Sequence, residues 1–451
     1  MKKVIGFLFF LLLLSHAPVE AQKVWSLEEC INYAIENNLM IKRQELNVQY
    51  SRNNHNQSYF NALPNVNGQV NYTRNDGNTI DNSLEIPRYV NQKYWDGTFG
   101  LHSSVTLFGG FQVINNIIKT KYDFLKSKSD LEKSKNDIST QLALAYLQVL
   151  FSKELVDVAA NKLEVTTLQT ERTEKMLQVG NVAQGDYLQI KAQESNDKTS
   201  LVNAQNNLDM AYLDLTQLLD LDSVSGFDVV FPGSIEVELL APLLSVKEIY
   251  TIALETMPQI KSSQYALKSS EKELSMAWGQ LSPSVTMSGG LSSRYSQTAL
   301  DYTVEPPSTD YPFRDQMNDY YYKSLGFGIA IPIFNKFQVK NAISNSKLQV
   351  KDYKYQLDLS EMALYKEVQQ AHADATAARE KYYSSVEAVN YNEEAFKYTS
   401  QKMEVGLVNS VDYNVAQNNL ISAKSSMLQA KYEYIFKLKI LDLYMGKPIT
   451  L

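Results

Sequence analysis

Four short segments of the chain alternate between hydrophobic and polar residues with a period of two. In the first segment Val66, Val70 and Tyr72 share one face, and polar residues fill the other. Such alternation predicts strands, because successive side chains of a strand point to opposite sides. Each segment is about 10 residues long, the length of a strand that crosses a bilayer at a tilt. The four predicted strands cover about residues 65–74, 97–108, 284–296 and 322–334.

A soluble antiparallel sheet that buries one face would show the same alternation. Two features favour a sheet in a membrane instead. The polar faces lack the charges that a solvated sheet usually carries, and aromatic residues collect at the strand ends. Aromatic side chains concentrate at both interfaces of membrane proteins, where a ring can meet the lipid headgroups. The aromatic clusters are Tyr59-Phe60, Tyr94-Trp95, Trp278 and Tyr320-Tyr321-Tyr322.

Most of the remaining chain is predicted to be helical. Residues 111–177 and 337–404 contain neither proline nor glycine, and their apolar residues recur at spacings of three and four. A helix of that length would extend about 100 Å. Shorter helices, about residues 186–221 and 411–445, are expected to return alongside the long ones. Apolar residues outside the main stripe indicate that each helix packs against neighbours on both flanks.

The same order of landmarks occurs twice. Ser26-Leu27-Glu28-Glu29 recurs as Ser245-Val246-Lys247-Glu248, and the helix-ending prolines Pro64 and Pro283 correspond. A repeated order along the whole chain indicates duplication. We expect a first repeat over residues 22–243 and a second over 244–451. Each would contain two helices, two strands, a long helix and a return helix.

The N-terminus is typical of a cleaved secretory signal. Two lysines precede an apolar run from Val4 to Leu14, which is too short to span a bilayer, so residues 1–21 are expected to be removed. Gln22, not cysteine, follows the expected cleavage site, so no N-terminal lipid anchor is indicated. Cys30 is the only cysteine and is expected to be a small core residue. A net charge of −7 argues against nucleic acid as a partner.

At this point the chain resembles the TolC family of outer-membrane efflux proteins over essentially its whole mature length. The resemblance rests on the duplicated order of several short motifs, each weak alone. They are Ser26-Leu27-Glu28-Glu29 with Ala34, the Pro64 and Pro283 junctions, the strand exits Leu107-Phe108-Gly109-Gly110 and Ile333-Phe334-Asn335-Lys336, and the turns Val179-Gly180…Asp186-Tyr187 and Val405-Gly406…Asp412-Tyr413.

This resemblance implies a homotrimer in the outer membrane of a Gram-negative bacterium. Three chains would form a 12-stranded barrel, continued by a long α-helical barrel in the periplasm. Residues 222–243 would lie in the family's equatorial belt. Such proteins dock onto a periplasmic adaptor (membrane fusion) protein and an inner-membrane pump. They serve tripartite efflux or type I secretion and need no cofactor, so the fold class is mainly α with a membrane β-barrel.

Val179-Gly180 and Val405-Gly406 fall where each long helix must stop and reverse. One interpretation is a C-terminal glycine cap, because glycine accepts a positive φ at little cost. The resemblance adds a second, that these helix tips contact the adaptor. The two interpretations are compatible.

Asp186 and Asp412 follow the two reversals. With Ser410 as N-cap, Asp412 would lie in the first turn of a helix, where its charge suits the helix dipole. The alternative is a ring of three aspartates at the periplasmic aperture, which would favour cations. Family members often carry a second acid three positions on. Here Val415 and Gln189 occupy those positions, which weakens the case for a strong cation preference.

No catalytic or metal-binding constellation is present in the sequence, so an enzyme is not expected. The histidines left after processing, His55, His102 and His372, lie far apart. The charged faces of the long helices are expected to be solvated surface. Two other functions remain open: a periplasmic coiled-coil scaffold without a pore, and an outer-membrane adhesin. A scaffold does not explain four strands of bilayer length, and an adhesin would need larger external insertions.

Overall fold

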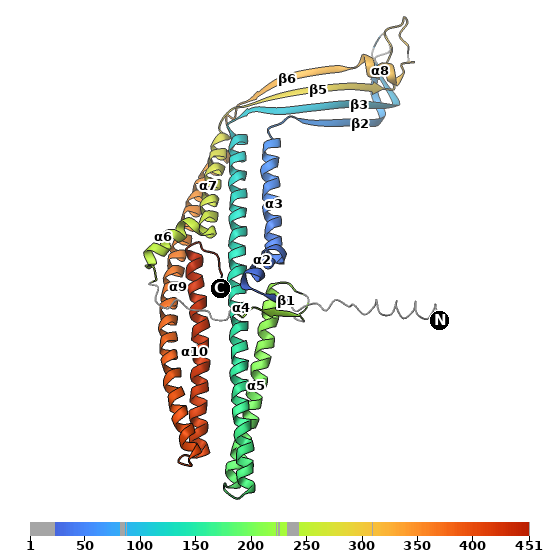
Figure 1. Cartoon of the computed structure of the whole chain (residues 1–451). Coiled ribbons are helices and arrows are strands. Elements are labelled where there is room, and N and C mark those ends of the chain that lie inside the picture. Colours follow the sequence, from blue (N-terminus) through green and yellow to red (C-terminus); the bar gives the residue numbers. More distant parts are fainter. Residues whose placement is uncertain are drawn as a thin grey trace, which may run out of the picture. The chain divides into compact units, whose positions relative to one another are not determined.

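The computed structural model describes residues 23–81, 86, 88–221, 223, 226–231, 243–308 and 310–450. The expected signal segment lies outside this part of the chain, as does most of the segment 222–243. The strands are β1 (Lys23–Trp25), β2 (Asn65–Asp81), β3 (Arg88–Gly109), β4 (Phe227–Val229), β5 (Ser284–Ser296) and β6 (Tyr322–Ala330). The helices are α2 (Leu27–Asn37), α3 (Leu39–Phe60), α4 (Gln112–Gln178), α5 (Gln184–Leu218), α6 (Val246–Thr256), α7 (Pro258–Gly279), α8 (Phe313–Asp319), α9 (Gln338–Glu404) and α10 (Ser410–Tyr444). Figure 1 shows their course.

The chain divides into two compact units. The helical unit comprises Met1–Asn47, Lys128–Lys261 and Asp358–Leu451. The sheet unit comprises Val48–Ser127 and Ser262–Leu357. Within the described residues, no helix combines the length and the apolar character needed to cross a membrane.

The sheet unit contains one antiparallel sheet with the strand order β2-β3-β5-β6 (Figure 1). β2 and β3 are longer than predicted: β2 continues beyond residue 74 to Asp81, and β3 begins before residue 97, at Arg88. Their ladder extends into polar residues that carry no alternating pattern, because backbone pairing does not depend on side-chain polarity. β6 ends at Ala330, short of the predicted residue 334. Pro332 follows, and proline cannot donate a hydrogen bond to a ladder.

Large apolar side chains are exposed on one face of this sheet. Val66, Val70, Leu325, Phe327 and Ile329 are each exposed over more than half of their surface. Rings group beside α8: Tyr72 stacks on Trp95 at 5.0 Å and on Tyr295 at 6.3 Å between ring centroids, and Tyr295 lies 5.4 Å from Phe313 of α8. An exposed apolar surface of this extent marks a site of contact with a membrane or with another protein.

Helices of equal length recur in the two halves of the chain. α2 and α6 have 11 residues each, α3 and α7 have 22, α4 and α9 have 67, and α5 and α10 have 35. The short helices α2 and α6 begin with a capping box, in which Ser26 pairs with Glu29 and Ser245 with Glu248. A capping box satisfies two backbone N–H groups that the first turn leaves unpaired.

The core of the helical unit lies where α2, α4 and α5 meet the short parallel pair β1–β4. Cys30 is fully buried there, as predicted, and burial raises the pKa of its thiol to about 12. The hydroxyl of Tyr146 contacts the carbonyl oxygens of Trp25 at 3.1 Å and Val230 at 2.7 Å. It therefore joins the long helix to both strands in a dry environment, where an unpaired carbonyl would be costly.

Asp228 of β4 links the same pair of strands to α4 and α5. Its Oδ1 accepts hydrogen bonds from Tyr212 at 2.6 Å, Lys153 at 2.9 Å and its neighbour's backbone N–H at 2.8 Å. Burial opposes ionisation, but the hydrogen bonds from Tyr212 and Lys153 outweigh it, so the pKa of Asp228 is lowered.

A lowered folded-state pKa adds stability above the unfolded value of about 3.9, and this stability is lost as the pH falls through the folded value. We therefore expect the melting temperature of the wild type to fall more steeply between about pH 5 and pH 3 than that of Asp228→Asn. Melts followed by circular dichroism measure this, with the exposed Asp157→Asn as control. Parallel pH profiles of the wild type and Asp228→Asn would contradict the assignment.

Candidate functional sites at the helix tips

The turn from α4 to α5 is built around Gly180. Its backbone has φ 75°, a left-handed conformation that glycine adopts without strain. The Gly180 N–H donates to the Leu177 carbonyl at 2.9 Å, and the Asn181 N–H donates to the Met176 carbonyl at 2.8 Å. This pair of bonds is a Schellman motif, which closes the C-terminus of a helix. The glycine-cap interpretation is therefore correct at this tip.

The turn from α9 to α10 repeats the same geometry. Gly406 has φ 74°, its N–H donates to the Met403 carbonyl at 3.1 Å, and the Leu407 N–H donates to the Lys402 carbonyl at 2.8 Å. A Cβ added at either Gly180 or Gly406 would meet nothing within 4 Å. The caps account for the glycines, but they leave the surface above each turn open.

Apolar side chains project from both turns into this open space. Val179 and Val405 are each 70% exposed, and Leu407 is 74% exposed. A surface hollow of about 490 Å³ runs along the last turns of α4 beside Val179. It is lined by Leu168, Glu171, Arg172, Lys175, Met176 and Val179. Exposed aliphatic groups that gather on a surface in this way mark a site of protein contact.

Asp186 and Asp412 both lie in the first turn of their helices and are exposed. The N-cap of α10 is Asn409, not Ser410 as predicted: its Oδ1 accepts from the Asp412 N–H at 2.9 Å. The helix therefore begins at Ser410, one residue earlier than expected, and an asparagine caps as well as a serine. α5 begins after Ala183 without any side-chain cap. Among the described residues of the two turns, no hydrogen bond or ion pair joins one turn to the other.

The structure also places charges where the sequence analysis expected solvated surface. Asp197 of α5 has a side chain only 1% exposed, and it pairs with Lys162 of α4 at 2.9 Å. Thr166 and Gln193 each donate a further hydrogen bond to Asp197 at 2.7 Å. Sequence alone does not reveal this pair, because a lysine and an aspartate 35 positions apart look like ordinary helix surface. Removing either partner of such a pair is strongly destabilising, because it leaves an uncompensated buried charge.

A second group of polar contacts joins α9 and α10. Lys437 lies 2.7 Å from Asp374, and the hydrogen bonds from Lys437 and Gln370 lower the pKa of Asp374. Lys381 and Glu433 form another bridge at 2.8 Å. In the described part of the chain, no group of three histidine, cysteine or acidic side chains is arranged to hold a metal ion.

Comparisons with known proteins agree with this architecture. The family model described as "Outer membrane efflux protein" matches residues 30–220 and 249–447. Outer membrane efflux protein BepC of Brucella suis biovar 1 is 23% identical over 339 residues, which cover 75% of this chain and 70% of BepC. These matches confirm the resemblance to the TolC family.

Solved structures show the same fold. CusC, described in terms of folding and transmembrane channel formation, is similar with a TM-score of 0.79 at 16% identity, covering 94% of this chain and 92% of CusC. The outer membrane protein VceC of Vibrio cholerae has a TM-score of 0.75 at 14% identity, covering 94% and 96%. The matches cover both halves of the chain. The protein therefore belongs to the outer membrane efflux protein family, whose members are transport channels and not enzymes.

Proposed function

We propose that this chain is the exit duct of a tripartite efflux or type I secretion system. It acts as a passive conduit through which small molecules or proteins leave the cell. The observation that carries the proposal is the combination of a bilayer-length sheet with one exposed apolar face and long helices that end in open, apolar tips. An energised pump and an adaptor, both separate chains, supply the driving force and the choice of cargo.

The conduit requires more than one copy of the chain. Along the described strands the sheet ends at β2 on one side and at β6 on the other. Backbone N–H and C=O groups at an open edge have no partner in hydrocarbon, so a membrane sheet must close. Three copies of the four-stranded sheet would supply twelve strands, enough for an open lumen. In this trimer the helices continue the barrel into the periplasm.

An exposed stripe on α9 supports packing between copies. Leu348, Tyr355 and Met362 follow one another at intervals of seven residues and are each more than 60% exposed. Leu359, between them, is 63% exposed. Apolar residues at heptad spacing form the seam of a coiled coil, so a helix of a neighbouring copy is the expected partner of this stripe.

The test of the proposed function is the oligomeric state together with conductance. Native mass spectrometry of detergent-extracted protein should give a species of three chains, and planar bilayers containing that species should conduct ions. Leu348→Glu should deplete the trimer by about tenfold, because a charge in a coiled-coil seam costs more than 1 kcal/mol. The neighbouring Gln349→Glu adds the same charge beside the stripe and should leave assembly intact. A stable, folded monomer without conductance would overturn the proposal.

Asp412 is the proposed aperture residue, with Asp186 in the equivalent position of the first repeat. Like charges around a three-fold axis repel and attract cations to the space between them. We expect Asp412→Asn to lower the cation preference of single channels by no more than about twofold, since exposed charges interact weakly and Val415 adds no second acid.

Reversal potentials under a salt gradient measure this change, with Asp209→Asn, an exposed acid of α5 away from the turn, as control. Asparagine serves a helix N-terminus nearly as well as aspartate. If Asp412 acts only on the helix dipole, neither the reversal potential nor trimer assembly should change.

A further inference from the structure

A groove lies on the apolar face of the sheet, beneath helix α8. Its volume is about 380 Å³, and it is lined by Gly68, Gln69, Val70, Phe99, Gly100, Leu101, Leu291, Ser292, Ser293, Met317 and Tyr321. Three of these residues form one cross-strand row, because Gly68 pairs with Leu101 and Leu101 with Leu291. Residues directly opposite in a ladder point to the same face. The floor of the groove is therefore the exposed apolar surface itself.

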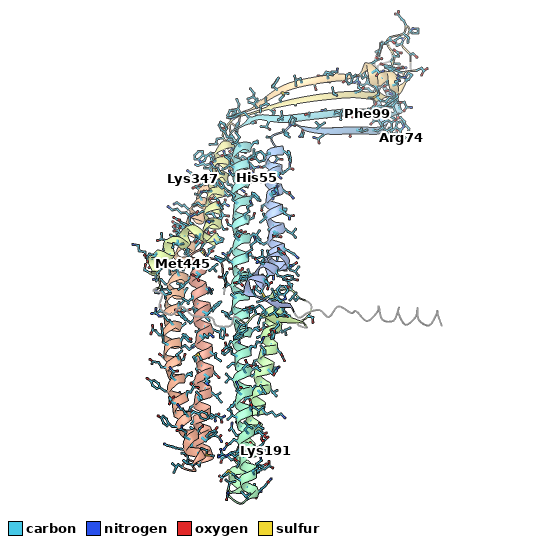
Figure 2. All side chains as sticks on the ribbon, viewed as in Figure 1. His55, Arg74, Phe99, Lys191, Lys347 and Met445 are labelled. Atoms are coloured by element: carbon cyan, nitrogen blue, oxygen red, sulfur yellow. The ribbon has the colours of Figure 1, made fainter. Side chains whose placement is uncertain are left out.

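Helix α8 forms the roof of the groove and is held firmly on the sheet. The ring of Phe313 lies 5.5 Å from that of Phe99 and 5.4 Å from that of Tyr295. Figure 2 labels Phe99 at the end of the sheet where α8 lies. Ser293 donates to the Met317 carbonyl at 2.9 Å, and the buried Gln316 accepts from the Ser296 N–H at 2.8 Å. The sequence analysis predicted no element between the strands at 284–296 and 322–334, so neither the helix nor the groove was anticipated.

Lys323 places a positive charge at the end of the groove floor. The row Gly68–Leu101–Leu291 continues to Lys323 of β6, which pairs with Leu291. The Lys323 ammonium lies 5.2 Å from the ring centroid of Tyr321, itself a lining residue. On the same face Arg74 lies 5.8 Å from the ring of Trp95. Lysine and arginine on a lipid-facing surface extend towards the headgroups while their stems cover apolar surface.

We propose that this groove binds one acyl chain of an anionic lipid, whose phosphate contacts Lys323. The inference rests on the membrane position of the sheet, which is part of the proposed function. An outer-membrane channel meets lipid on its exposed apolar face, and in the groove an acyl chain would contact both the strands of the floor and Met317 of α8. The cation at its end complements a phosphate-bearing headgroup. Asp315 and Asp319 of α8 oppose this attraction, although Asp319 is engaged by the Tyr311 hydroxyl at 2.7 Å.

Because of these opposing charges, the expected headgroup preference is modest. Native mass spectrometry of the delipidated protein, titrated with phosphatidylglycerol or phosphatidylcholine, measures how much of each lipid is retained. We expect the wild type to retain phosphatidylglycerol about fivefold more strongly, as one favourable charge contact allows. Lys323→Gln should abolish that preference. Lys347→Gln is the matched control, because Lys347 also lies over a ring, that of Trp278 at 5.1 Å, but outside the groove.

The acyl chain is tested by filling the groove. A Cβ at Gly68 would meet only Leu101, at an ordinary 3.4 Å, so Gly68→Leu can place its side chain in the groove without strain. This variant should retain both lipids less strongly, by about fivefold or more. Gly289→Leu adds the same side chain to the same face outside the lining, where the nearest atom lies 3.7 Å from the new Cβ, and should behave as the wild type.

Equal retention of the two lipids by the wild type, or unchanged retention by Gly68→Leu, would overturn the inference. A groove occupied by a protein partner would give the same result, since lipid retention would then not depend on Gly68. The spectra also report the mass of the assembly. If the protein is a trimer and neither Lys323→Gln nor Gly68→Leu changes lipid retention, the lipid site alone is refuted. If the protein is a monomer, the proposed function is refuted.

Discussion

Gly406→Trp and Gly180→Trp should each abolish export while leaving trimers in the outer membrane. Each indole would fill the open space above a Schellman turn, where the exposed Val179 and Val405 are the proposed adaptor contacts. It would also force a large residue into a left-handed conformation, at a cost of about 1–2 kcal/mol. This cost is local to the turn and should not unfold the long helices, so a loss of export would indicate a loss of docking. Efflux or secretion assays in intact cells, with immunoblots of outer-membrane fractions, measure both quantities.

Two controls separate crowding of the surface from backbone strain. Gly226 has φ 82° and open space around its Cβ position, but it precedes β4 and lies outside both turns. Gly226→Trp therefore carries a similar strain and should export normally. Gly406→Asn is small and tolerates a positive φ, so it should retain most export. If Gly180→Trp and Gly406→Trp both export normally, the docking assignment is wrong. If Gly226→Trp also loses export, backbone strain and not crowding of the tips explains the loss.

Gly110→Ala should prevent stable folding of the sheet unit, although it adds a single methyl group. A Cβ at Gly110 would lie 2.1 Å from the carbonyl oxygen of Gly279, at the end of α7. A Cβ at Gly279 would in turn lie 2.3 Å from the Gly110 carbonyl oxygen. Both obstacles are backbone atoms, so a helix end or a strand exit would have to move. We expect a loss of about 3 kcal/mol or more, at the upper end of overpacking costs.

The neighbouring Gly109→Ala is the control, because its Cβ would meet only a methyl group of Thr106, at 3.3 Å. Backbone strain alone does not explain the expected difference. Lys336, which occupies the corresponding strand exit in the second half, is accommodated at φ 53°. Urea unfolding followed by tryptophan fluorescence, together with the amount of protein in the membrane, measures the effect. Equal midpoints for the two alanine variants would show that the Gly110–Gly279 approach does not limit stability.

Much of the architecture could be predicted from short stretches of sequence. Period-two alternation located the strands, and the absence of proline and glycine located α4 and α9, because both signals depend only on neighbouring residues. Gly180 and Gly406 marked the helix reversals for the same reason, since a left-handed turn demands glycine locally. The family followed from the order of these landmarks.

Features that depend on residues distant in sequence could not be predicted in this way. The extension of β2 and β3 is set by pairing between the strands, and helix α8 is held by Phe99 and Ser293 and not by a strong local pattern. The pairing of Lys162 with Asp197 and the close approach of Gly110 to Gly279 involve residues 35 and 169 positions apart in the sequence. Local sequence specifies the type of each element because its forces act over a few residues. Tertiary packing alone decides which side chains and backbones meet, and so which groove and which charges reach the surface.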